Sequence, residues 1–215
     1  TRSGAPRPIR VLHVITWMDV GGAQDHVLSL VSGLDPGRFE VAVATGTSKG
    51  ALGRLFDPLA DAVQVVPLQH LRREISPLHD LLAVREIRQL IKAFQPDILH
   101  THSSKAGVVG RLAAAGTRVK TVHNVHGWTF YATENPLLRR AVIALERRFA
   151  AHTDVMLNVS AADAAVGQAN GITPRVSTEV VRGGIDINRF REARRHNRGR
   201  PPSSGPLIGT VGRLA

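Results

Sequence analysis

Short apolar segments alternate with longer amphipathic ones along most of this chain, and this alternation constrains the fold more than any other feature. Apolar runs of about four to eight residues bounded by turn signals indicate buried strands, whereas apolar residues that recur every three or four positions indicate helices. Strands are predicted at 10–16, 40–45, 63–68, 97–102, 120–126, 154–160 and 179–182. Helices are predicted between them, at 23–34, 77–94, 105–115, 136–151 and 161–169. The sequence therefore predicts an α/β domain with a Rossmann-like parallel sheet flanked by helices.

The character of the sequence changes near its C-terminal end. Residues 196–206 are rich in Arg, Gly, Pro and Ser, as interdomain linkers are, and Leu207–Val211 is again a buried-strand pattern. A lone strand is a poor folding unit. We therefore expect an N-terminal domain at 1–190, a linker at 191–205, and at 206–215 the first strand of a truncated second domain.

Composition argues against nucleic-acid binding and bears on location. The net charge is +11, but six arginines and only one glutamate lie between Arg189 and Arg200. With one Tyr, two Trp and six Phe, no platform of interleaved aromatic and basic residues for stacking bases is seen, and nucleic-acid binding is not expected. The chain has no cysteine, no signal-peptide pattern and no apolar run long enough to span a membrane, so a cytoplasmic location is expected.

The first predicted strand runs into a glycine pair, Gly21 and Gly22, immediately before a predicted helix. Glycines let the backbone approach a bound group, and the N-terminal end of a helix favours an anion such as a diphosphate. The pattern is neither the dinucleotide fingerprint nor a P-loop. A tight strand-to-helix turn without a ligand is the alternative.

The fourth predicted strand ends in polar residues, among them His100, His102, Ser103 and Lys105. Such residues at the carboxyl end of a parallel strand line the crevice where open α/β sheets bind ligands. His100 and His102 share one face of the strand, but a metal would need further ligands that the spacing does not supply, so no metal is predicted. The alternative for one of the histidines is a hydrogen-bonded core residue.

The fifth predicted strand also ends in polar residues, and His126 is the strongest single candidate for a site residue. Trp128 follows it closely in the sequence. Sugars need directional partners for their hydroxyls and aromatic faces for their apolar sides, and this segment offers both. Trp128 and Tyr131 could instead pack beneath the following helix.

One segment has the features of a membrane-binding surface. The predicted helix at 77–94 carries an apolar stripe with basic flanks, but an ordinary core-facing helix with a solvated outer face is the favoured explanation for the helix as a whole. The loop before it, with Arg72 and Arg73, is the favoured point of contact with an anionic membrane.

Five motifs in order, each at a predicted strand end, together resemble the N-terminal half of the family-four retaining glycosyltransferases. They are Gly21–Gln24, Asp97–Gly107, Val122–Gly127, Asn158–Asp163 and Gly184–Phe190, and the last strand, Ile208–Leu214, resembles the start of that family's C-terminal domain.

The resemblance implies one half of a GT-B fold, in which this half binds mainly the acceptor. It implies that Gly21 and Gly22 lie near the donor diphosphate, that His126 contacts the transferred sugar, and that His102, Ser103 and Lys105 help to shape the acceptor side. The implied reaction moves a sugar from a nucleotide-sugar to a hydroxyl with retention, without a metal or other cofactor. The family's paired glutamates and most nucleotide-binding groups belong to the other domain, so this fragment is not expected to turn over alone.

Two departures from the family pattern stand out: Gln24 replaces a frequent Glu, and Val181–Asp186 replaces a Pro-Asn-Gly-Ile-Asp type of sequence. The expected function is a hexosyltransferase-type enzyme of bacterial polysaccharide or glycolipid synthesis, acting on a carbohydrate or lipid-linked acceptor. Two alternatives remain: a non-catalytic module that recruits a catalytic partner chain, and a GT-B sugar-nucleotide epimerase.

Overall fold

The computed structural model describes residues 7–18, 21–47, 63–173, 176–185, 187–188 and 191. Contacts divide the chain into two units, Thr1–Gly184 and Ile185–Ala215. The sheet and its covering helices belong to the first unit. Apart from Arg191, the predicted linker and the predicted strand at 206–215 lie outside the described residues. The domain boundaries therefore stay a prediction.

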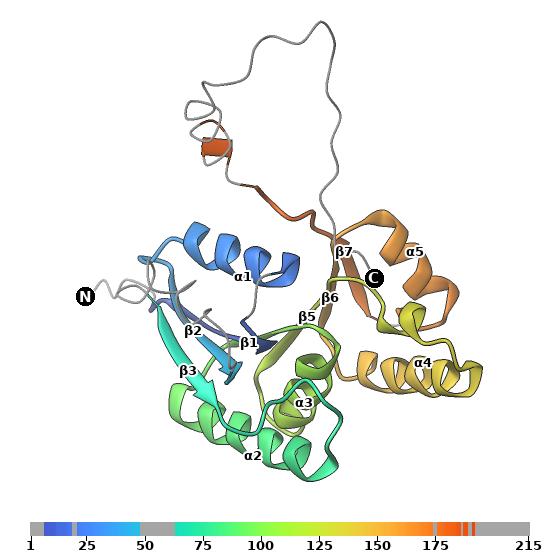
Figure 1. Cartoon of the computed structure of the whole chain (residues 1–215). Helices are drawn as coiled ribbons and strands as arrows, with labels where there is room; N and C mark the ends of the chain where they lie inside the picture. Colours follow the sequence, from blue (N-terminus) through green and yellow to red (C-terminus); the bar gives the residue numbers. More distant parts are fainter. Residues whose placement is uncertain are drawn as a thin grey trace, which may run out of the picture. The chain divides into compact units, whose positions relative to one another are not determined.

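Seven parallel strands form one sheet, in the order β3-β2-β1-β4-β5-β6-β7 (Figure 1). Their bounds are β1 Ile9–Trp17, β2 Phe39–Gly46, β3 Gln64–Leu68, β4 Ile98–His102, β5 Lys120–Val125, β6 Val155–Asn158 and β7 Ser177–Val180. The predicted parallel α/β sheet is confirmed. The prediction for β7 began two residues late because it followed Val180 and Val181, whereas pairing with β6 already begins with Ser177 opposite Val155.

The helices lie in the connections, as predicted. They are α1 Gly22–Gly33, α2 Pro77–Phe94, α3 Ser104–Ala114, α4 Pro136–Ala150 and α5 Ala161–Ala169, and a short 3-10 helix, η2 Thr129–Ala132, was not predicted. None of the helices in the described ranges is long and apolar enough to cross a lipid bilayer.

Local chemistry explains where these helices begin and end. The side chain of Asn135 accepts hydrogen bonds from Leu137 N and Leu138 N and so caps α4, and Ser160 caps α5 by accepting from Asp163 N. Gly116 and Gly171 have φ of 78° and 62°, the left-handed conformation expected of glycine just after a helix. Both glycines occupy the helix-end positions expected from the sequence.

The helices cover both faces of the sheet. In Figure 1, α1 lies on one side of β1 and β2, and α2 and α3 lie on the other. On the first face, Ile15 and Val43 pack with Val27 and Val31 of α1. On the other face, Leu12, Val14 and Leu99 pack with Ile87 of α2 and Val109 of α3. Successive side chains of a strand point to opposite faces because the sheet is pleated. A third cluster joins Val125 and Met156 to Ala150 of α4.

The strand order reverses between β1 and β4. From β1 the chain builds outward through β2 and β3, then returns to the other side of β1 and continues from β4 to β7. Open α/β sheets bind ligands at such a switch point, outside the carboxyl ends of the strands. A ligand is therefore expected to bind where β1, β4 and β5 end.

Candidate active site

Hydroxyl groups join the ends of β1 and β4 at the switch point. Thr16 Oγ1 lies 2.6 Å from Ser103 Oγ and accepts a hydrogen bond from Ala106 N, at 3.2 Å. Ser103 has φ of 69°, an unfavourable conformation for a residue other than glycine, and such strain concentrates at functional sites. The predicted site residue Ser103 is thus held at the crevice by its own hydroxyl and by the start of α3.

The glycine pair opens directly into α1. A Cβ built on Gly22 would meet nothing within 4 Å, so the space beside it is open, and the first-turn N–H groups of a helix have no partners within the helix. Gln24 Nε2 donates to Trp17 O at 3.1 Å. An ionised glutamate has no proton to donate there, which explains how Gln24 fits this turn.

His126 follows the end of β5 and is the centre of the candidate site. Its Nε2 lies 3.2 Å from His102 Nδ1 and 3.0 Å from Asn124 Nδ2. The ring of His26 in α1 lies edge-on to it, with 5.1 Å between centroids. The beginning of α1 and the predicted sugar-binding histidine therefore share one edge of the sheet.

His126 is uncharged at neutral pH. Its side chain is partly buried, and burial, with a smaller contribution from His26, lowers its pKa to about 4. A neutral imidazole offers one N–H donor and one acceptor, which suits hydrogen bonding to a sugar better than it suits charge pairing.

Two other predicted residues are engaged with the protein itself. His102 is fully buried, so it lies behind His126 rather than on the surface, and its predicted direct contact with an acceptor stays a prediction that this burial argues against. Lys105 Nζ contacts Asp80 Oδ1 at 2.7 Å and donates to Glu74 O. Lys105 thereby joins the start of α3 to the loop before α2.

Trp128 packs in the core and also lines a pocket. Its ring is buried, stacks on Phe130 and donates from Nε1 to Asp163 O at 2.8 Å, so it packs in the core as the alternative interpretation held. It also lines a pocket of about 210 Å³ that includes Ser103, Asn124 and His126. Contact with a sugar stays a prediction, whereas Tyr131 is exposed.

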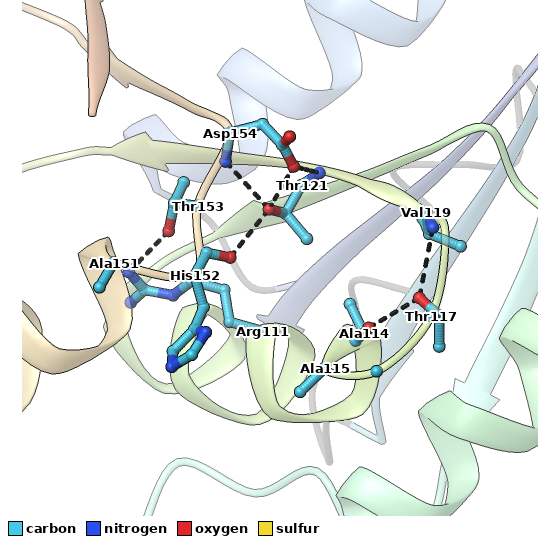
Figure 2. Close-up of a pocket in the computed structure, with 11 residues that line it drawn as sticks. Arg111, Ala114, Ala115, Thr117, Val119, Thr121, Ala151, His152, Thr153 and Asp154 are labelled. Atoms are coloured by element: carbon cyan, nitrogen blue, oxygen red, sulfur yellow. Dashed lines mark hydrogen bonds between the residues drawn. The ribbon is translucent and has the colours of Figure 1, made fainter. Parts of the chain in front are cut away.

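A second pocket, of about 270 Å³, lies at the opposite edge of the sheet (Figure 2). Its lining comes from the amino ends of β5 and β6 and the C-terminal end of α3. Several of its polar groups are satisfied within the protein: Thr121 Oγ1 donates to His152 O at 3.0 Å, and Asp154 accepts from Thr121 N at 2.8 Å. Despite its larger volume, this pocket lies away from the edge where parallel sheets bind ligands.

The sequence did not single out His13, which lies in the middle of β1. In the structure, ring nitrogens of His13, His100 and His102 come within 4.8 Å of one another. A tetrahedral metal would need a fourth ligand, and the prediction that no metal is required stays a prediction. The sequence signal that could have identified His13 is its position as a polar residue inside a fully buried strand, because a buried polar side chain needs a hydrogen-bond partner.

An open parallel sheet with polar groups gathered at the carboxyl edge beside the switch point defines a ligand-binding α/β domain. The model of Glycosyltransferase Family 4 matches residues 20–189, most of the chain, and the chain therefore belongs to Glycosyltransferase Family 4.

A relative in Escherichia coli, UDP-Gal:alpha-D-GlcNAc-diphosphoundecaprenol alpha-1,3-galactosyltransferase, is 28% identical over 186 residues. The match covers 86% of this chain and 47% of that protein, so the chain spans about half of the relative's length.

Solved structures agree on the architecture. HepE of Anabaena, crystallised with UDP and glucose, matches with a TM-score of 0.63 at 20% identity, over 87% of this chain and 50% of that one. Sucrose-phosphate synthase from Thermosynechococcus elongatus matches with a TM-score of 0.66 at 15% identity, over 85% and 49% respectively. The chain thus has the fold of one half of a GT-B structure, as the resemblance implied.

Proposed function

We propose that this chain is the acceptor-side half of a retaining glycosyltransferase, which moves a hexosyl group from a nucleotide-sugar to a hydroxyl of a carbohydrate or lipid-linked acceptor. The observation that carries the proposal is the position of neutral His126 at the switch point, against the first turns of α1. Gly21 and Gly22 would face the donor diphosphate, and His126 the sugar. The reaction would serve polysaccharide or glycolipid assembly on the cytoplasmic side of a bacterial membrane.

The relative's name provides the first substrates to test. Protein expressed from the full reading frame should transfer galactose from UDP-galactose to a diphosphoundecaprenol-linked N-acetylglucosamine, or to another acceptor of this class. We expect His126→Ala to lower kcat/KM by about 100-fold or more, the usual cost of losing a polar contact made in the transition state. His152→Ala, on an exposed residue at the opposite edge, serves as the control and should keep full activity.

The outcomes separate the alternatives. If every nucleotide-sugar stays intact in the presence of lipid and carbohydrate acceptors, the transferase proposal fails. Conversion of a UDP-sugar to its epimer without any acceptor would indicate an epimerase. A reading frame that stops at Ala215, with binding of a second α/β chain, would indicate the recruiting module.

The same proposal includes contact with an anionic membrane through the start of α2. Ile75, Leu78 and Leu81 expose 87%, 66% and 67% of their surface, and Arg72 and Arg73 directly precede them. Exposed apolar side chains beside arginines match a bilayer that carries anionic lipids. Because Lys105 joins this loop to α3, and Arg73 lies over the ring of Trp17, the loop is anchored beside the site.

Binding to phospholipid vesicles measures this contact. We expect Ile75→Glu with Leu78→Glu to lower partitioning into anionic vesicles at least about tenfold, because each buried apolar side chain contributes about 1.5 kcal/mol or more. Leu112→Glu on α3, also partly exposed, should have little effect. Equal binding of wild-type protein to neutral and anionic vesicles would contradict the role of the arginines.

A further inference from the structure

Three histidines form a hydrogen-bonded series across β1, β4 and the end of β5. His13 Nδ1 lies 3.1 Å from His102 Nε2, and His102 Nδ1 lies 3.2 Å from His126 Nε2. Strand register makes this possible, since Ile15 pairs with His102 and His102 pairs with Asn124, so these side chains share the face of His13. With Asn124, the three histidines make up what we call the histidine array.

The two inner members cannot touch a ligand directly. His13 and His102 expose only 1% and 0% of their surface, and burial lowers the pKa of both, that of His13 to about 4. Histidines that reach neither solvent nor ligand, and that remain uncharged, act only through the groups that they contact. The outermost of these groups is His126.

The assignment of a proton to one nitrogen of each ring defines the direction of the hydrogen bonds in the array. Each neutral imidazole has one N–H and one acceptor nitrogen. Asn124 Nδ2 is a donor that lies 3.0 Å from His126 Nε2 and 3.4 Å from His126 Nδ1. The shorter contact makes Nε2 the acceptor, and its one lone pair is shared between Asn124 and the proton of His102 Nδ1. His102 Nε2 is then an acceptor in its turn and receives the proton of His13 Nδ1.

The opposite direction leaves buried donors unsatisfied. Within the histidine array, the buried side-chain atoms without a partner are Asn124 Oδ1 and His13 Nε2, and in the first direction both are acceptors. Reversing the array would require a rotated Asn124 amide and would leave two N–H groups, one on Asn124 and one on His13, buried without an acceptor. Unsatisfied N–H donors are rarer in proteins than unsatisfied acceptors, so the first direction is favoured.

We propose that His13 and His102 are positioning residues which, with Asn124, hold neutral His126 with its proton on Nδ1. His126 then presents an N–H donor, rather than an acceptor, to an oxygen of the bound sugar. This inference rests on the proposed function for the identity of the ligand, but not for the protonation pattern. It gives His102 an indirect role in place of a direct contact with the acceptor.

A metal ion bound by His13, His100 and His102 would explain part of the same cluster. The hydrogen-bonded array is favoured because its spacing continues unbroken to His126 and Asn124, beyond the reach of such an ion. The two alternatives predict different metal contents for the purified protein: a stoichiometric ion or none.

Nitrogen NMR of protein with ¹⁵N-labelled histidine rings reads the tautomers directly, at a pH above 7 where the array is neutral. We expect Nε2 of His126 to resonate as an unprotonated nitrogen and Nδ1 as a protonated one, with the same pattern for His102. Resonances are assigned by single substitutions, His126→Gln among them. A protonated Nε2 in His126, or a stoichiometric metal whose removal by a chelator shifts the His13, His100 and His102 resonances, would overturn the proposal.

Variants test the path through the array. His102→Leu should shift His126 toward the Nε2-protonated tautomer, whereas His102→Asn, whose amide can donate from the position of Nδ1, should retain the wild-type pattern. His13→Leu should disturb the tautomer of His102 although it touches nothing at the surface. If His102→Leu folds and leaves the His126 tautomer unchanged, the array does not position it.

Turnover by the full-length enzyme gives an independent measurement. We expect His102→Leu to lower kcat/KM about tenfold, the equivalent of one hydrogen bond, and His102→Asn to recover most of this loss. If the predicted tautomers are found but no sugar is transferred, the proposed function fails and the array stands. If transfer occurs with the opposite tautomers, the array fails and the function stands.

Discussion

Acidification from pH 7 to pH 5 is expected to destabilise this protein by about 4 kcal/mol or more, through its buried histidines. Burial lowers the pKa of His13 and of His126 to about 4, while in the unfolded chain each returns to about 6.5. Below pH 6.5 the unfolded chain therefore binds protons that the folded chain does not. The free energy of unfolding is therefore highest above about pH 6.5, decreases as the pH falls, and stops decreasing near pH 4.

The size of the expected destabilisation follows from the lowered pKa values of His13 and His126. At pH 5 each of these two histidines costs about 2 kcal/mol relative to pH 7. His100, His102 and His123 have their pKa lowered in the same direction, mainly by burial, and add to the loss. Since domains are commonly stable by only about 5–15 kcal/mol, unfolding near pH 5 is expected.

Urea denaturation at pH values between about 8 and about 4.5, in steps of about half a unit, measures how the free energy of unfolding changes with pH. His13→Leu removes one buried titrating group and should make the dependence on pH shallower. His152→Gln removes an exposed histidine and should leave it unchanged. Stability that is flat between pH 7 and pH 5 would mean that these rings are charged or solvated in the folded protein.

Replacing Glu146 by leucine is expected to destabilise the fold by about 3–5 kcal/mol, because it leaves the buried Arg111 guanidinium without its counter-charge. The two side chains expose 4% and 0% of their surface and lie 3.1 Å apart. Arg111 also donates from Nε to Gly107 O at 2.8 Å, so it remains fixed in place when its partner is lost. Burial lowers the pKa of Arg111, opposed by Glu146.

A double variant distinguishes loss of pairing from loss of packing. Arg111→Met with Glu146→Leu removes both charges and should recover most of the stability lost by the single change. Glu134→Leu, on an exposed glutamate, should change the free energy of unfolding by no more than about 0.5 kcal/mol. If the double variant is no more stable than Glu146→Leu, the pair contributes through shape rather than charge.

The sequence predicted the elements of this fold well, for a physical reason. Fully buried parallel strands are almost continuously apolar, as Val11–Ile15 and Val41–Thr45 are apart from a few polar residues, and the covering helices have the 3.6-residue period. Edge strand β7 was placed less accurately because an exposed strand carries no such apolar signature. The short helix η2 has too few residues to show a period.

The candidate site was predicted in outline only. Strand ends pointed to His102, Ser103 and His126, and these do gather at one edge of the sheet. His13 was missed because its partner lies 89 positions away, and sequence pattern does not determine which strands are neighbours. Lys105 looked free for a ligand because its partners lie far upstream, Asp80 in the first turn of α2 and the Glu74 carbonyl in the loop before it.

The histidine array is made entirely of bonds within the unit Thr1–Gly184. The orientation of His126 is therefore determined by hydrogen bonds of this unit alone. Under the proposed function, a chimaera that joins this unit to a foreign donor-binding half is expected to keep the geometry at His126.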